Sequence, residues 1–181
     1  MDAFEDLIAT LLEKDGFWVQ TTFKVELTKE EKKEIGRPSS PRWKLDLIAY
    51  KASTNDILAV ECKSYLDSYG VRLSGFDGSS EVESNRYKLF NESKLREVVF
   101  NRLVSQLEVL GACAPEPQVR LCLAVGHIYR DEDRDGLHAL FEKNGWELLD
   151  EEWIKIRLKR LAEIGYENST AAVVTKLLIR S

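Results

Sequence analysis

Apolar residues near the N-terminus recur at the spacing of a helix. Those that would share one face are Phe4, Leu7, Ile8, Leu11 and Leu12. Gly16 stands where a helix C-terminal glycine is expected, so the pattern predicts an amphipathic helix over residues 3–15. The next segment, FWVQTTFKVEL, is rich in β-branched and aromatic residues, which is typical of a strand.

Two further apolar runs, RWKLDLIAYK and ILAVECKSY, have the length of strands. The short segment ASTND joins them, and its length and composition favour the turn of a hairpin. Residues 28–41, which precede this hairpin, are first charged and then rich in Gly, Pro and Ser. That composition predicts a loop between the first strand and the hairpin.

The rest of the chain begins with an aperiodic stretch and then alternates between helical and strand patterns. Residues 66–92 contain three glycines and no clear period, which predicts a long irregular insertion of the kind that is usually functional or disordered. The predicted elements that follow are a helix over 92–112, a strand over 119–126, a helix over 133–145, a short strand over 146–149, and helices over 150–165 and 168–180. Asn168 or Ser169 would cap the last helix.

This order predicts an α/β fold in which helices flank a mixed β-sheet and extra helices lie at the C-terminal end. At 181 residues the chain is expected to form one domain. Its core would span about residues 1–126, and residues 127–181 would form a C-terminal α/β extension packed on that core.

Composition indicates a globular protein of the cytoplasm. Hydrophobic residues make up 44% of the chain and charged residues 31%. No apolar run approaches the roughly 20 residues that span a bilayer, so no membrane partner is expected, and the first residues lack the pattern of a signal peptide. Cys62, Cys113 and Cys122 form no CxxC pair, which favours reduced thiols over disulfides or a zinc site.

The net charge of −5 argues mildly against a protein that coats nucleic acid indiscriminately. Basic residues nevertheless gather in two stretches. Residues 37–51 hold four bases and one acid, and residues 86–102 hold five bases and two acids. These clusters are either solvated surfaces or contacts for phosphate groups.

Two acidic residues interrupt the apolar runs of the predicted hairpin. A turn near residues 53–54 places Glu61 opposite Asp46 on the neighbouring strand, and Lys63 projects on the same side as Glu61. Two carboxylates directly opposite each other repel, and a divalent cation between them removes that conflict. Lys63 would then orient or deprotonate a metal-bound water, which is the chemistry of phosphodiester hydrolysis. The alternative is that all three charges are solvated ends of ordinary strands.

A carboxylate in one strand followed by Glu-x-Lys in its hairpin partner resembles the signature of the PD-(D/E)XK nuclease superfamily, which includes restriction endonucleases and archaeal Holliday junction resolvases. The resemblance extends upstream to FEDLIATLLEKDGFWV, where Glu5 lies on the first helix and a Gly-Phe pair enters the first strand. It covers residues 5–63 directly, and the following helix and strand in order only. One departure is Leu45, which stands where the name of the motif has Pro.

The resemblance implies a restriction-endonuclease-like fold and a set of site residues. Asp46, Glu61 and the backbone carbonyl of Cys62 would bind Mg²⁺ or Mn²⁺. Lys63 would be the catalytic lysine, and Glu5 would add a ligand or orient water. Gln106 resembles a glutamine that some members place near the site. Basic residues would line the substrate groove together with the insertion at 66–92: Arg42, Lys44, Arg72, Arg86 and Lys88.

The expected function is therefore a metal-dependent endonuclease, a hydrolase acting on the phosphodiester bonds of DNA, and many such enzymes dimerise. Two alternatives stay open. One is a catalytically silent protein of the same fold that binds nucleic acid or a protein partner, and the other is a nuclease acting on RNA.

Overall fold

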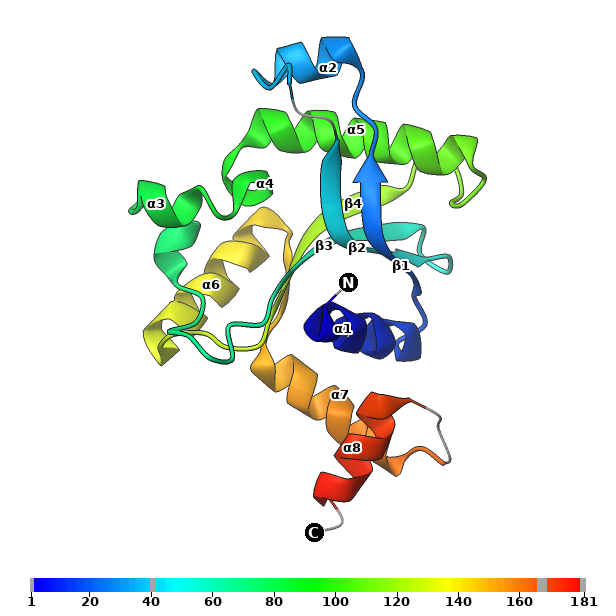
Figure 1. Cartoon of the computed structure of the whole chain (residues 1–181), viewed down its shortest axis with the longest axis vertical. Helices are drawn as coiled ribbons and strands as arrows, with labels where there is room; N and C mark the ends of the chain where they lie inside the picture. The colour runs from blue at the N-terminus through cyan, green and yellow to red at the C-terminus, as the bar shows by residue number, and fades with distance from the viewer. Residues whose placement is uncertain (1, 40–41, 166–168, 180–181) are drawn as a thin grey trace.

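The structure, a computed structural model, describes residues 2–39, 42–165 and 169–179. Five strands form one sheet in the order of the chain (Figure 1). They are β1 (Trp18–Val25), β2 (Trp43–Lys51), β3 (Asp56–Lys63), β4 (Gln118–Val125) and β5 (Glu147–Leu149). The first three strands pair antiparallel, whereas β3, β4 and β5 run parallel.

Helices cover both faces of this sheet, so the predicted α/β fold with a mixed sheet is confirmed. The helices are α1 (Ala3–Lys14), α2 (Lys29–Glu34), α3 (Glu81–Ser84), α4 (Lys88–Asn91), α5 (Ser93–Val109), α6 (Asp131–Asn144), α7 (Glu151–Glu163) and α8 (Thr170–Ile179). Figure 1 shows α1 and α5 on opposite sides of the strands. Among the described residues, no helix has both the length and the apolar character that crossing a bilayer requires.

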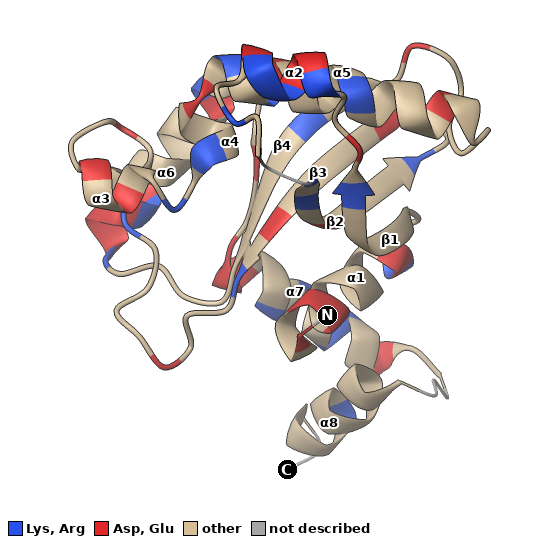
Figure 2. Cartoon of the chain, turned by 45° about the horizontal axis from the view of Figure 1, so that its top comes forward, with Lys and Arg blue, Asp and Glu red and all other residues tan. Residues whose placement is uncertain are grey.

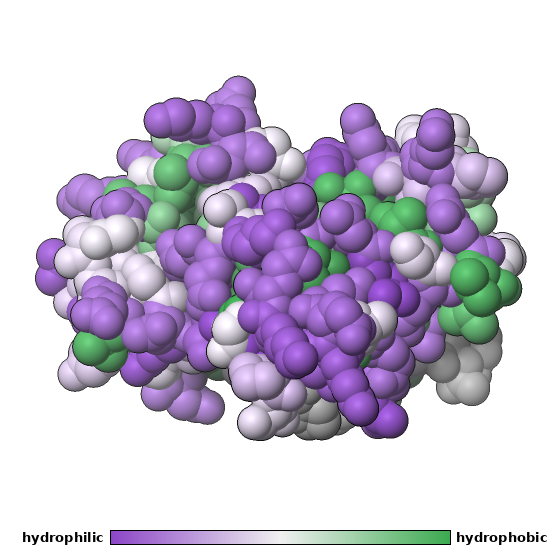
Figure 3. Space-filling view, turned by 90° about the horizontal axis from the view of Figure 1, so that it is seen from above, coloured by the Kyte–Doolittle hydropathy of each residue, from purple (hydrophilic) through white to green (hydrophobic). Residues whose placement is uncertain are grey.

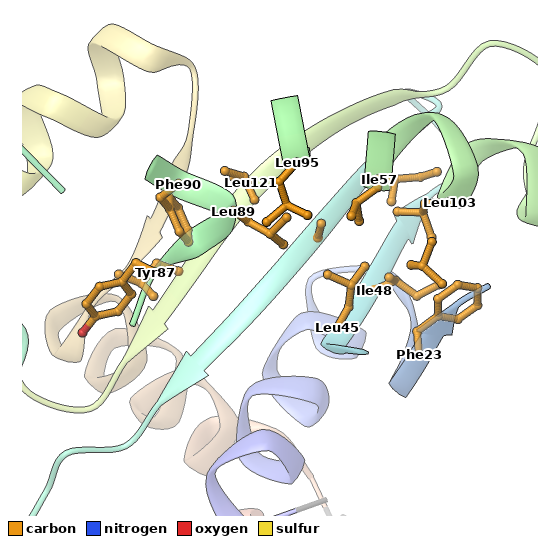
Figure 4. Close-up of a cluster of buried hydrophobic side chains, with 14 of the residues drawn as sticks. Phe23, Leu45, Ile48, Ile57, Tyr87, Leu89, Phe90, Leu95, Leu103 and Leu121 are labelled. Atoms are coloured by element: carbon orange, nitrogen blue, oxygen red, sulfur yellow. The ribbon is translucent and has the colours of Figure 1, made fainter. Parts of the chain in front are cut away.

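Two hydrophobic clusters hold these layers together because residues of the central strands alternate between the faces. Ile57 and Ala59 of β3 face α5, and Leu58 and Val60 face α1 and α7. On the α5 side, Leu95 and Leu103 lie over the strands (Figure 4). Because successive side chains of β3 point to opposite faces and both faces are buried, the strand has one continuous apolar run in its sequence.

The segment predicted as a loop over residues 28–41 contains the short helix α2, so that prediction was wrong in part. Thr28 and Glu31 form a reciprocal cap. The Thr28 hydroxyl accepts from the Glu31 N–H at 3.2 Å, and the Glu31 carboxylate accepts from the Thr28 N–H at 2.7 Å. Arg102 of α5 adds an ion pair to Glu31 at 2.7 Å. The T-x-x-E pattern at Thr28 and Glu31 therefore begins a helix in a segment whose charged composition predicts a loop.

The insertion at 66–92 is more ordered than its composition predicts. It contains a 3-10 turn, Leu73–Gly75, together with α3 and α4. Phe76 and Tyr87 stack with ring centres 4.3 Å apart, and Phe90 packs edge-on against Phe76 at 5.3 Å. This aromatic packing orders a stretch that has no hydrophobic period. Large rings bury so much apolar surface that a few of them are enough.

The C-terminal part adds β5 to the sheet edge and packs α7 against α1. α8 contacts α7. The Ser169 hydroxyl accepts from the Ala172 N–H at 3.1 Å, so Ser169 caps α8, whereas Asn168 lies outside the described residues.

Candidate functional site

Asp46 lies where the pairing between β2 and β3 ends. The last pair of the ladder is Leu47 with Val60, the register that a turn near residues 53–54 predicts. One step further, Oδ2 of Asp46 accepts a hydrogen bond from the Cys62 N–H at 3.0 Å. Thr22 of β1, across from Asp46, has a φ of 54°, which a β-branched residue seldom adopts. Such irregularities re-aim side chains at sheet edges and functional sites.

Glu61 and Lys63 lie on one side of β3 and form an ion pair at 2.9 Å. Both side chains are largely shielded from solvent, with 21% and 25% exposed. Burial raises the pKa of Glu61; the charge of Lys63 opposes this rise and the charge of Asp46 adds to it. Burial alone would lower the pKa of Lys63, but the neighbouring Glu61 and Asp46 raise it, so Lys63 stays charged.

The three side chains line one cleft of about 180 Å³. Its apolar wall includes Leu45, Ala59, Leu89 and Leu121, and three bases line it as well: Lys44, Arg86 and Lys88. Figure 2 shows acidic and basic positions close together on the ribbon of β2 and β3. Charged groups in a small, partly apolar cleft interact more strongly than in water, so the site is able to hold a cation or an anionic group.

Two of the expected substrate-binding residues lie elsewhere. Arg42 pairs with Glu26 at 2.9 Å on the exposed surface, and it is not part of the cleft lining. Arg72 lies against the ring of Tyr129, with 4.2 Å between the guanidinium carbon and the ring centre. The structure thus brings together Lys44, Arg86 and Lys88 and separates them from Arg42 and Arg72.

Glu5 approaches Cys62 from the other face of the sheet. Its carboxylate accepts from the Asp2 N–H at 3.3 Å, which completes the cap of α1, and the residue is 7% exposed. Burial raises the pKa of the Cys62 thiol, and the charges of Asp46, Glu5 and Asp2 add to this effect. Glu5 is therefore close to the Cys62 side chain but does not line the cleft.

Gln106 also lies away from the cleft. Its amide oxygen accepts from the Glu26 N–H at 2.7 Å, and its amide nitrogen donates to the Lys24 carbonyl at 3.3 Å. The side chain of Gln106 therefore contacts β1. Unlike the glutamine that it resembles in sequence, it does not line the cleft.

The donor set fits a hard divalent cation that keeps some of its water. In the part of the chain that the structure describes, no three His, Cys, Asp or Glu side chains form a ready metal centre. Asp46 and Glu61 nevertheless share one cleft, and Mg²⁺ is usually held by one or two carboxylates and several waters. The raised pKa of Glu61 shows that its negative charge is disfavoured there, and a bound cation would relieve this cost.

The sequence predicts Arg86 and Lys88 of the insertion as residues of the groove, but it does not point to their neighbours. Asn85 and Leu89 lie in the lining of the cleft, and Tyr87 between them is buried at 1% exposure. Burial raises the pKa of Tyr87, and a hydrogen bond with Tyr65 adds to the rise. These positions carry no motif, so only the aromatic content of the segment points to them.

Comparison with protein-family models, with curated proteins and with solved structures finds no match to this chain. The class of protein therefore has to be argued from its own residues and geometry.

Proposed function

We propose that this protein is a metal-dependent nuclease that hydrolyses phosphodiester bonds, with DNA as the preferred substrate. The observation that carries the proposal is the convergence of Asp46, Glu61 and Lys63 in one cleft with a basic lining. The chain order of α1, three antiparallel strands, α5 and a parallel β4 is also the order expected from the resemblance to PD-(D/E)XK nucleases.

Asp46, Glu61 and the Cys62 carbonyl would hold Mg²⁺ or Mn²⁺, and the cation would supply charge neutralisation and an acidic water. Lys63, kept protonated by Glu61, is placed to hold that water or to neutralise the attacked phosphate. Lys44, Arg86 and Lys88 would bind the phosphates on either side. The role of Glu5 would be indirect, through the charge that it places beside Cys62.

The test is cleavage of linear, circular and branched DNA with Mg²⁺ or Mn²⁺. Wild type is compared with Asp46→Ala, Lys63→Ala and the control Lys159→Ala, which removes an exposed lysine of α7. The proposal expects cleavage by wild type and by the control, and none by the two cleft variants. Cleavage by all four proteins would reject the site, and cleavage by none would reject the activity.

A catalytically silent protein of the same fold is the second candidate. The observation that favours it is that both carboxylates already have partners, Asp46 in the Cys62 N–H and Glu61 in the Lys63 ammonium. Calorimetric titration with Mn²⁺ separates the candidates, because a silent scaffold needs no cation in this cleft. Parallel assays with RNA test the third reading, a ribonuclease.

A further inference from the structure

The segments that follow β3 and β4 form a paired platform next to Lys63. The two strands stay in register up to Lys63 and Val125, and the chains then continue side by side. The Val71 N–H donates to the His127 carbonyl at 3.0 Å, and the Tyr129 N–H donates to the Val71 carbonyl at 2.9 Å. A Cβ on Gly126 would lie 2.3 Å from the Ser64 carbonyl oxygen, so this close approach requires glycine.

This platform presents two tyrosines and two arginines in one cluster: Tyr69, Arg72, Tyr129 and Arg130. The guanidinium carbons of Arg72 and Arg130 lie 4.2 and 4.5 Å from the centre of the Tyr129 ring. Tyr69 meets Tyr129 edge-on at 6.1 Å, and 75% of Tyr69 is exposed. The cluster therefore offers planar groups to the solvent from a fixed backbone.

Its arginines differ from most others in the described part of the chain. Those that pair with a carboxylate are Arg37, Arg42, Arg86, Arg102, Arg120, Arg134 and Arg157. Within residues 2–39, 42–165 and 169–179, neither Arg72 nor Arg130 forms an ion pair with a carboxylate. Their charge is thus available to an anionic partner.

We propose that this cluster binds unpaired nucleotides, so that the substrate of the neighbouring cleft carries a single-stranded segment. The inference rests on the proposed nuclease function and adds the substrate class. Exposed aromatic rings and guanidinium planes stack on bases of any sequence, and the arginine charges attract the phosphates. A duplex hides the faces of its bases and would use only the charges.

The position of the cluster agrees with a strand that leads into the cleft. Tyr69 follows Lys63 by six residues, so the chain between them spans at most about 20 Å. A stacked strand would therefore need at most about six nucleotides between the two sites, at a rise of 3.4 Å each. The same insertion supplies Arg86 and Lys88 to the cleft, so one segment contributes to both surfaces.

The experiment measures binding without metal, by fluorescence anisotropy of labelled dT20, U20 and a 20-base-pair DNA duplex in EDTA. The variants are Tyr69→Leu and Arg72→Lys, which keeps the charge but loses the planar group. The control is Trp18→Leu, because Trp18 on β1 is equally exposed at 79%. Thermal melting establishes that each variant is folded.

We expect wild type to bind a single strand more tightly than the duplex, and each cluster variant to weaken single-strand binding by about tenfold. Duplex binding should change by about twofold or less, and Trp18→Leu should behave as wild type. The ratio of dT20 to U20 affinity compares a DNA strand with an RNA strand. Equal affinity of wild type for both forms, or unchanged single-strand binding in folded variants, would overturn the inference.

Failure here is distinguishable from failure of the nuclease proposal. Single-strand binding that depends on Tyr69, in a protein that cleaves nothing, supports the cluster and rejects the catalytic site. Cleavage that depends on Asp46, with single-strand binding independent of Tyr69 and Arg72, does the reverse.

Discussion

The Asp46 carboxylate accepts a hydrogen bond from the Cys62 N–H at 3.0 Å and thereby continues the link between β2 and β3 beyond their last paired residues. Its second oxygen faces the Lys44 ammonium at 3.9 Å. Asp46 thus has a structural contact in addition to its proposed role at a metal. The two roles are separable, because a hydrogen bond needs an acceptor, whereas a cation needs the charge.

Replacement of Asp46 by Asn and by Ala is predicted to separate these roles. Asn keeps an acceptor for the Cys62 N–H, so its free energy of unfolding should stay within about 0.5 kcal/mol of wild type, whereas Ala should lose about 1–2 kcal/mol. Both variants should bind Mn²⁺ at least about tenfold more weakly, since the ligand charge is gone. Urea unfolding and calorimetry measure the two effects. Wild-type Mn²⁺ affinity in Asp46→Asn would exclude Asp46 as a ligand.

Lys63→Gln is predicted to remove catalysis and leave metal binding in place. The ammonium of Lys63 lies 2.9 Å from Glu61, so it is close to the proposed cation but cannot coordinate it while protonated. Cleavage should fall by about 10²–10³-fold, the usual cost of removing one charged donor that stabilises the transition state. Mn²⁺ affinity should remain equal or increase. Lys159→Gln is the matched control, and an equal loss of activity in both variants would argue against a specific role for Lys63.

The hairpin and its register follow from the sequence, because a short turn and two apolar runs leave little freedom. The register of a hairpin is fixed by its turn type and loop length, so the short segment ASTND determines the pairing of Leu47 with Val60. The same reasoning places Asp46 next to Glu61 and gives Lys63 its side of the strand.

The rest of the site depends on contacts between distant segments. Leu89 reaches the cleft because Phe76, Tyr87 and Phe90 pack together, and no periodic pattern announces such packing. Arg72 has the charge of a substrate-binding residue, but its place is determined by the bridge between Val71 and Ile128. Residue type alone therefore predicts the chemistry of a basic side chain but not the surface on which it lies.

Stability at acid pH should depend on Asp150, which is 4% exposed at the start of α7. Burial would raise its pKa, but the Trp153 N–H at 2.9 Å, His138 at 3.0 Å and Arg134 at 3.1 Å lower it below the ordinary value of 3.8. Because the pKa of Asp150 is lower in the folded than in the unfolded state, its ionised carboxylate stabilises the folded protein at pH values above the unfolded-state pKa. This contribution is lost as the pH falls below about 3.8.

Asp150→Asn should therefore lower the free energy of unfolding by about 1–3 kcal/mol at pH 7, and the difference from wild type should shrink as the pH falls below 3.8. Urea unfolding at a series of pH values measures that difference. Asp135→Asn, on the exposed face of α6, serves as the control and should stay near wild type throughout. A difference that does not change with pH would show that Asp150 acts through packing and not through its charge.

Gln106 is predicted to protect the edge of the sheet. Its side chain forms hydrogen bonds with the Lys24 carbonyl and the Glu26 N–H, at the end of β1. A strand of another molecule would otherwise pair with these two backbone groups. Gln106→Ala should lower the free energy of unfolding by about 1 kcal/mol and increase self-association at high concentration, because an unpaired edge invites strand addition. Urea unfolding and sedimentation velocity measure these effects. Ser105→Ala is the control on the same helix, since the Ser105 hydroxyl bonds to the Asn101 carbonyl within α5. If both variants match wild type in stability and mass, the contact of Gln106 with β1 has no protective role.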